Sequence, residues 1–167
     1  MRNLHQLFDA ASSTFTYVLV DPGTRDAVII DAVDSAFDAY SALIGRERLR
    51  LRYVLETHTH ADHITAASRL RESTGAKAAT PLPCGIVAAD LQLEDGEVLR
   101  FGGESVRALH TPGHTAGSMS YLWRDCVFTG DTLLIGGCGR TDFQSGDAAS
   151  SDFGQQPLRH DIPQRFS

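Results

Sequence analysis

The sequence has no long hydrophobic run and almost no lysine. No stretch approaches the roughly 18 consecutive apolar residues that a membrane-spanning helix needs. The first residues mix Arg2, His5 and Asp9 with isolated apolar side chains, so we expect neither a signal peptide nor a transit peptide there. Lys77 is the only lysine, and 15 Lys+Arg against 21 Asp+Glu give a net charge of −6. Because phosphate-rich partners are bound by clustered cations, we expect neither nucleic acid nor a membrane as a partner.

Cysteine is also scarce, with Cys84, Cys126 and Cys138 as the three residues of this type. An odd number of widely spaced cysteines, none of them in a C-x-x-C pair, makes no disulfide framework. This pattern is typical of a reducing compartment, and we expect a cytoplasmic protein. The rest of the composition is ordinary for one soluble domain, with 167 residues of which 42% are hydrophobic and 22% are charged.

Short β-branched segments alternate with helical spacings along most of the chain. The patterns predict strands at 16–20, 27–31, 49–55, 76–80, 98–101, 105–110, 119–123 and 126–129, and helices at 32–46 and 64–73. The first helix is expected to end at Gly45, and the glycine-rich residues 130–139 predict a loop with tight backbone geometry. Interleaved strands and helices indicate one α/β (α+β) domain with mixed sheets.

The densest chemical signal is His58-x-His60-x-Asp62-His63, which places four metal-capable side chains within six positions at the end of a predicted strand. Strand alternation would send His58 and His60 to one side, and the following turn can bring Asp62 and His63 round to a common centre. Imidazole and carboxylate ligands suit Zn, Fe or Mn, and no cysteine pair supports a structural zinc site. The spacing therefore predicts a metal site.

Two more metal-capable side chains follow on turns that adjoin strands. His114 lies in the turn Thr-Pro-Gly-His-Thr at 111–115, and Asp131 ends the run Phe-Thr-Gly-Asp at 128–131. Either residue alone could be an ordinary turn residue or a helix cap. Because rigid flanking strands can present a ligand accurately, both residues together with the first cluster predict a complete ligand set.

These residues resemble the signature of the metallo-β-lactamase superfamily, H-x-H-x-D-H followed downstream by a histidine and then an aspartate. A narrower resemblance is to the persulfide dioxygenases, also called sulfur dioxygenases. It rests on L-F-D at 7–9, S-S-T-F-T-Y at 12–17, T-H-T-H-A-D-H-I-T at 57–65, Ser118, Tyr121 and G-C-G-R-T-D-F-Q at 137–144. The resemblance runs from about residue 4 to residue 149. The run at 137–144 is the part that separates this family from the glyoxalase II thioesterases.

The resemblance implies an αββα sandwich with one Fe(II) per chain at one of its edges. The two histidines and one aspartate that hold iron in the family map onto His58, His114 and Asp131, a facial triad with open positions for O₂ and a sulfur ligand. The implied reaction oxidises glutathione persulfide with O₂ to sulfite and glutathione, a step of sulfide detoxification. A second copy of the chain, in a homodimer, is the one macromolecular partner that we consider.

The same resemblance gives roles to residues beside the metal ligands. His60, Asp62 and His63 would orient ligands or bound water. Arg140 would hold the carboxylates of glutathione, a task that suits its forked and always charged guanidinium.

Two other functions stay open at this point. A glyoxalase II-type hydrolase would use two zinc ions, bridged by Asp131, to cleave a glutathione thioester, which makes zinc the alternative metal. A fragment of the metallo-β-lactamase fold without activity would retain no metal.

The end of the sequence bears on this choice. The family pattern stops near Ala149, and residues 150–167 are rich in Arg, Pro, Gln and Ser. We therefore expect an incomplete metallo-β-lactamase-like domain at 1–149, cut short by a frameshift or a truncation, and a weakly ordered tail at 150–167. The Gly-His-Asp motif that would complete a second metal site is not found in this tail. Its loss weakens the hydrolase prediction more than the dioxygenase prediction.

Overall fold

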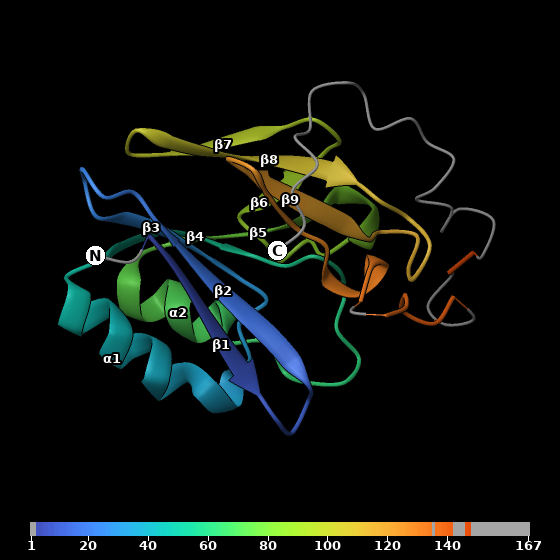
Figure 1. Cartoon of the computed structure of the whole chain (residues 1–167), viewed down its shortest axis with the longest axis horizontal. Helices are drawn as coiled ribbons and strands as arrows, with labels where there is room; N and C mark the ends of the chain where they lie inside the picture. Colours follow the sequence, from blue (N-terminus) through green and yellow to red (C-terminus); the bar gives the residue numbers. More distant parts are fainter. Residues whose placement is uncertain (1–2, 135, 142–145, 148–167) are drawn as a thin grey trace.

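The computed structural model describes residues 3–134, 136–141 and 146–147, which form two stacked sheets with helices on one outer face (Figure 1). The six-stranded sheet has the order β1-β2-β3-β4-β5-β6, and the four-stranded sheet has the order β10-β9-β8-β7. The strands are β1 (Leu4–Asp9), β2 (Thr14–Val20), β3 (Asp26–Ile30), β4 (Arg50–Leu55), β5 (Lys77–Pro81), β6 (Leu91–Leu93), β7 (Val98–Phe101), β8 (Glu104–His110), β9 (Met119–Trp123) and β10 (Cys126–Phe128). The α-helices are α1 (Phe37–Glu47) and α2 (Ala67–Thr74), and single 3₁₀ turns lie at Asp34–Ala36, Leu82–Cys84 and Gly130–Thr132.

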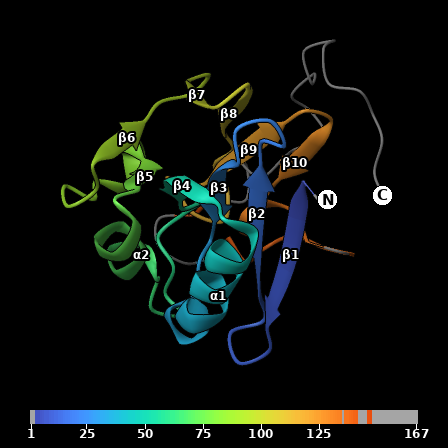
Figure 2. The ribbon, with the colours of Figure 1, turned by 90° about the vertical axis from the view of Figure 1, so that its left-hand side faces the viewer.

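Two separate apolar cores hold these layers together. Strand β3 is buried along its whole length because α1 and α2 cover one face of its sheet and the four-stranded sheet covers the other (Figure 2). Ala27 and Ile29 point toward the helices, whereas Val28 and Ile30 point toward the second sheet. Parallel pairing from β3 to β6 and antiparallel pairing from β1 to β3 make the mixed sheet that the sequence predicts. The two stacked sheets of the predicted sandwich are thus confirmed, and within the described residues helices cover the outer face of the six-stranded sheet.

Element ends differ from the predictions in several places. The segment expected to be one helix begins as a 3₁₀ turn, continues as α1 and runs through Gly45 to Glu47. Its C-cap is Arg48, which adopts a left-handed φ of 52° and donates its N–H back to the carbonyl of Gly45, so the prediction that Gly45 ends the helix was wrong. Helix α2 begins at Ala67 rather than residue 64, because Thr65 pairs with Val33 in an isolated β-bridge.

Two strands were not predicted at all. Strand β1 is an edge strand whose side chains are all at least partly exposed, and it lacks a clear hydrophobic alternation. Strand β6 has three residues, which is too short for a periodicity to be visible. None of the described helices is long and apolar enough to cross a membrane. The predicted tail at 150–167 lies outside the described residues.

Asp21 ties the β2–β3 turn to the second sheet. Its carboxylate accepts hydrogen bonds from the Thr24 hydroxyl at 2.6 Å, the Gly103 N–H at 2.9 Å and the Gly23 N–H at 3.1 Å. These hydrogen bonds, that of the Thr24 hydroxyl first, lower the pKa of Asp21 to about 2. Gly102 has a left-handed φ of 63°, and a Cβ there would come within 2.0 Å of the Asp21 Oδ2. The close approach of the β2–β3 turn to the turn between β7 and β8 therefore depends on Asp21 and Gly102.

Replacing Asp21 with Asn is expected to lower the melting temperature at pH 7 by several degrees. The folded-state pKa of about 2 lies below the unfolded value of about 3.9, so the contribution of Asp21 is complete above about pH 4 and disappears as the pH falls toward 2. Thermal melts of both proteins between pH 7 and pH 3 check this, with Asp125→Asn, an exposed turn aspartate, as the control. A melting difference that does not shrink toward pH 3 would contradict the expectation.

Candidate metal centre

The three predicted metal ligands come together at one edge of the sandwich. His58 follows β4 of the first sheet, while His114 follows β8 and Asp131 follows β10 of the second. One ligand atom from each of the three side chains lies within 4.8 Å of the other two. His58 is buried, and His114 and Asp131 are half-buried. The His114 Nε2 atom is 3.6 Å from the Asp131 Oδ2 atom.

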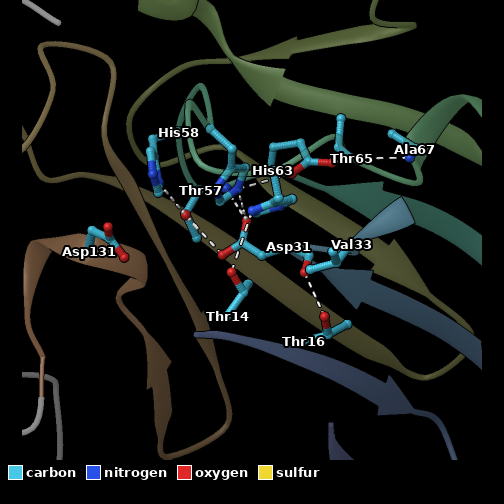
Figure 3. Close-up of polar contacts among 12 residues, drawn as sticks. Thr14, Thr16, Asp31, Val33, Thr57, His58, His63, Thr65, Ala67 and Asp131 are labelled. Carbon is cyan, nitrogen blue, oxygen red and sulfur yellow. Dashed lines mark hydrogen bonds and ion pairs between the residues drawn. The ribbon is translucent and has the colours of Figure 1, made fainter. Parts of the chain in front are cut away.

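Each histidine of this set already uses its Nδ1 atom. The Thr57 hydroxyl donates to Asp31 Oδ2 at 2.9 Å, so it accepts the hydrogen bond of His58 Nδ1, also at 2.9 Å (Figure 3). His114 Nδ1 donates to the carbonyl oxygen of Arg140 at 2.8 Å. Both Nε2 atoms therefore carry a free lone pair. Histidine ligands of metals in proteins are commonly held in this way, with the second ring nitrogen donating to an oxygen.

The electrostatics of the set also suit a cation. Burial lowers the pKa of His58 to about 4, and the positive charge of His60 adds to this effect. His58 is therefore neutral at pH 7, as a metal ligand must be. Neutral imidazoles and the Asp131 carboxylate are the donors that Zn, Fe and Mn accept. The residues present thus fit a divalent transition metal.

The other members of the H-x-H-x-D-H motif form a second group beside the first. One atom from each of His60, Asp62 and His63 lies within 4.8 Å of the others. Asp62 Oδ2 is 3.2 Å from His63 Nδ1, and the His60 ring centre is 4.2 Å from that of His58. The motif thus contributes ligand atoms to two adjacent groups, and the roles predicted for its residues stay predictions. The backbone turn that follows His58 divides the motif into two adjacent groups.

Two buried carboxylates that sequence reasoning missed hold His60 in place. His60 Nε2 donates to Asp31 Oδ1 at 3.1 Å and lies 3.2 Å from Glu56 Oε2, with the hydrogen bond directed to Asp31. Asp31 also accepts the Thr57 N–H at 2.7 Å, and the Thr65 hydroxyl donates to Glu56 Oε1. Charged residues directly after the buried strands β3 and β4 were the available signal, because the carboxyl ends of parallel neighbours meet at one edge.

The charges of this buried cluster are strongly coupled. Burial would lower the pKa of His60, but the hydrogen bond to Asp31 and the charges of both carboxylates raise it to about 11. Burial would raise the pKa of Asp31, yet the hydrogen bond and charge of His60 lower it overall. Burial dominates at Glu56 and raises the pKa of that carboxyl. Asp31 also adopts a left-handed φ of 52°, a strain that three hydrogen-bond donors to its carboxylate offset.

The second sheet fixes the backbone of the loop that carries His58. The buried Tyr121 hydroxyl donates to the Glu56 carbonyl at 2.8 Å, and the Met119 N–H donates to the Thr57 carbonyl at 2.8 Å. Ser118 accepts the Thr115 N–H at 3.0 Å and so shapes the turn next to His114. The loop is therefore held by both sheets. Arg140 is exposed, and its carbonyl faces His114.

Comparison with known proteins agrees with this geometry. The family model described as the metallo-beta-lactamase superfamily matches residues 10–83 and 84–160. The chain belongs to this superfamily. It is 44% identical over 147 residues to human mitochondrial persulfide dioxygenase ETHE1. The aligned residues cover 87% of this chain and 58% of that protein. The crystal structure of ETHE1 from Myxococcus xanthus superposes with a TM-score of 0.86 at 46% identity, covering 89% of this chain and 65% of that one.

Hydrolases of the same superfamily are also related to this chain. A hydroxyacylglutathione hydrolase from Rhodopseudomonas palustris (strain BisA53) is 34% identical over 139 residues, or 81% of this chain and 54% of that protein. The chain thus spans only 54–65% of the length of these relatives. The predicted resemblance to persulfide dioxygenases is confirmed at the level of sequence and fold. The cytoplasmic location, the homodimer and the domain boundary at residue 149 stay predictions.

Proposed function

We propose that the chain holds one Fe(II) with His58, His114 and Asp131 and oxidises glutathione persulfide with O₂ to sulfite and glutathione. The observation that carries this proposal is the convergence of two imidazoles and one carboxylate, with one ligand atom of each within 4.8 Å of the others. This donor set is typical of non-haem Fe(II) oxygenases, which keep open positions for their substrates. Its support from relatives is the 44% identity to a protein named persulfide dioxygenase.

The reaction balances as one persulfide, one O₂ and one water giving one glutathione and one sulfite, with two protons released. The terminal sulfur is oxidised, both atoms of O₂ are reduced, and the bond between the two sulfur atoms breaks. Iron, when bound, supplies the redox chemistry with O₂. The protein supplies the orientation of the ligands: Thr57 directs His58, and the Arg140 carbonyl directs His114.

The neighbouring polar residues receive supporting roles in this proposal. His60, Asp62 and His63 lie beside the ligand set, where they would orient bound water and the persulfide. The Arg140 guanidinium would bind a carboxylate of glutathione, since its fork forms two parallel hydrogen bonds to such a group. An exposed arginine next to a metal ligand suits a substrate with a reactive sulfur at one end and carboxylates at the other.

A second candidate function is hydrolysis of a glutathione thioester with two zinc ions. It is favoured by the adjacent side chains of Asp62 and His63, which offer ligand atoms for a second ion, and by the hydroxyacylglutathione hydrolase relatives. In that case Asp131 would bridge both ions. The two proposals differ in the number of metal ions, in the kind of metal and in the need for O₂.

Metal analysis and O₂ uptake on the same purified protein test these proposals. We expect about one iron per chain after anaerobic loading, and O₂ consumption with glutathione persulfide that yields one sulfite per O₂. Two zinc ions per chain, with thioester hydrolysis and no O₂ uptake, would replace the dioxygenase proposal by the hydrolase. A chain that retains neither metal and melts without cooperativity would overturn both.

A further inference from the structure

The glycine-rich segment at 137–140 returns to the metal centre through its backbone. Gly139 is buried although Cys138 and Arg140 on either side are exposed. The Gly139 N–H donates to the carbonyl oxygen of Asp131 at 2.8 Å. The carbonyl oxygen of the following residue, Arg140, accepts the hydrogen bond from His114 Nδ1 at 2.8 Å. Backbone groups of two successive residues, Gly139 and Arg140, therefore contact two of the three residues proposed as metal ligands.

Space, not backbone conformation, requires a glycine at position 139. Gly139 is not among the residues with a positive φ. A Cβ at this position would lie 2.4 Å from the Asp131 carbonyl oxygen, 2.8 Å from His114 Nδ1 and 3.0 Å from Asp131 Cβ. The first and third of these atoms belong to or adjoin the backbone of the Asp131 turn and cannot swing aside. A side chain at position 139 would therefore push the segment away from His114 and Asp131.

We propose that Gly139 and the Arg140 carbonyl are positioning residues for His114. A carbonyl oxygen only accepts hydrogen bonds, so this contact places a proton on His114 Nδ1 and leaves Nε2, 3.6 Å from Asp131 Oδ2, as the ring nitrogen for a metal. The bare Cα of Gly139 sets the distance at which the contact can form. This inference rests on the proposed metal centre and extends it to a segment that the sequence suggested for substrate binding.

Two tasks of Arg140 then become separable by mutation. Its guanidinium is the proposed group for substrate carboxylates, whereas its carbonyl orients His114. Arg140→Ala removes the first group and keeps the second. Gly139→Ala disturbs the second and keeps the first. Gly137→Ala is the matched control, since Gly137 lies in the same segment, has no positive φ, and a Cβ there would meet no atom within 4 Å.

The experiment measures Co(II) affinity, with absorption of the bound ion as the signal, and the ¹⁵N chemical shifts of the His114 ring in the metal-free protein. We expect Gly139→Ala to weaken Co(II) binding by about 10–100-fold, the usual effect of removing a partner of a histidine ligand. Gly137→Ala and Arg140→Ala should leave this affinity within about twofold of the unchanged chain, because neither alters a partner of His114. The His114 signal should report a proton on Nδ1 in the unchanged chain and in both of these variants, and a shift toward Nε2 in Gly139→Ala.

Several results would overturn the inference. The inference is overturned if the His114 ring of the unchanged metal-free chain carries its proton on Nε2 instead of Nδ1. This measurement needs no variant, so the test stays valid if Gly139→Ala fails to fold. Equal Co(II) affinities for Gly139→Ala and Gly137→Ala would overturn the inference as well. Neither measurement involves persulfide or O₂. An absence of dioxygenase activity in a chain that shows the expected tautomer and affinities would therefore contradict the proposed function and leave the positioning role intact.

Discussion

Asp131→Ala is expected to abolish O₂ uptake with glutathione persulfide, by more than about 100-fold, and to remove iron from the protein. Supporting residues around a metal ligand typically contribute 10–100-fold in affinity, and loss of the ligand itself exceeds that range. Asp131 supplies the only carboxylate of the set with His58 and His114. The variant keeps the Asp131 carbonyl that Gly139 contacts, so the turn itself should persist. Metal analysis and O₂ uptake on the same sample check this result.

Asp38→Ala provides the comparison for this variant. Asp38 is an exposed aspartate in the first turn of α1, on the helical face of the first sheet. It should retain about as much iron and activity as the unchanged chain. Retention of one iron and of normal O₂ uptake by Asp131→Ala would show that the metal is held elsewhere, and Asp62 and His63 would then be the next residues to test.

Asp31→Ala is expected to lower the free energy of unfolding by about 3–5 kcal/mol, the usual cost of removing one partner of a buried ion pair. Asp31 is 5% exposed and accepts hydrogen bonds from the Thr57 N–H, the Thr57 hydroxyl and His60 Nε2. Its loss would leave a buried imidazolium beside Glu56 alone and would free the hydroxyl that directs His58. Urea denaturation of the metal-free protein at pH 7 measures the change, and metal content should fall as well.

Asp34→Ala is the matched control, since Asp34 lies only three positions further along the chain. Its carboxylate pairs with Arg69 at 3.2 Å near the surface, and both side chains are at least one third exposed. Exposed pairs of this kind contribute about 0–1 kcal/mol. Similar losses for Asp31→Ala and Asp34→Ala would contradict the view that the buried cluster holds the metal loop in place.

The convergence of the three proposed metal ligands could be predicted from the sequence because their signal is local. The motif at 58–63 follows β4, whose last three residues are Tyr-Val-Leu, and His114 and Asp131 each follow a strand with a clear pattern. The division of the motif into two groups could not be predicted in this way. It depends on the backbone turn after His58 and on Asp31, which comes from a strand more than twenty residues earlier.

The buried carboxylates show the same limit of local patterns. Asp31 and Glu56 meet because β3 and β4 are parallel neighbours, a pairing that no short segment encodes. The end of α1 at Arg48 illustrates another case, since the segment lacks a glycine where the left-handed C-cap forms. Tertiary pairing of the strands decided the first feature, whereas the strands of the two cores follow from residues that the sequence already marks as apolar.

The hydrogen bonds from Tyr121 and Met119 to the carbonyls of Glu56 and Thr57 have a consequence for the behaviour of the whole domain. The loop that presents His58 is fixed from the opposite sheet, and the other two proposed ligands follow strands of that sheet. Any change that lets the sheets slide or separate slightly must therefore increase the distances from His58 to His114 and Asp131 before the strands unfold. The metal affinity of the proposed centre thus depends on the spacing between the sheets. As the temperature rises, this affinity should decline before the domain unfolds.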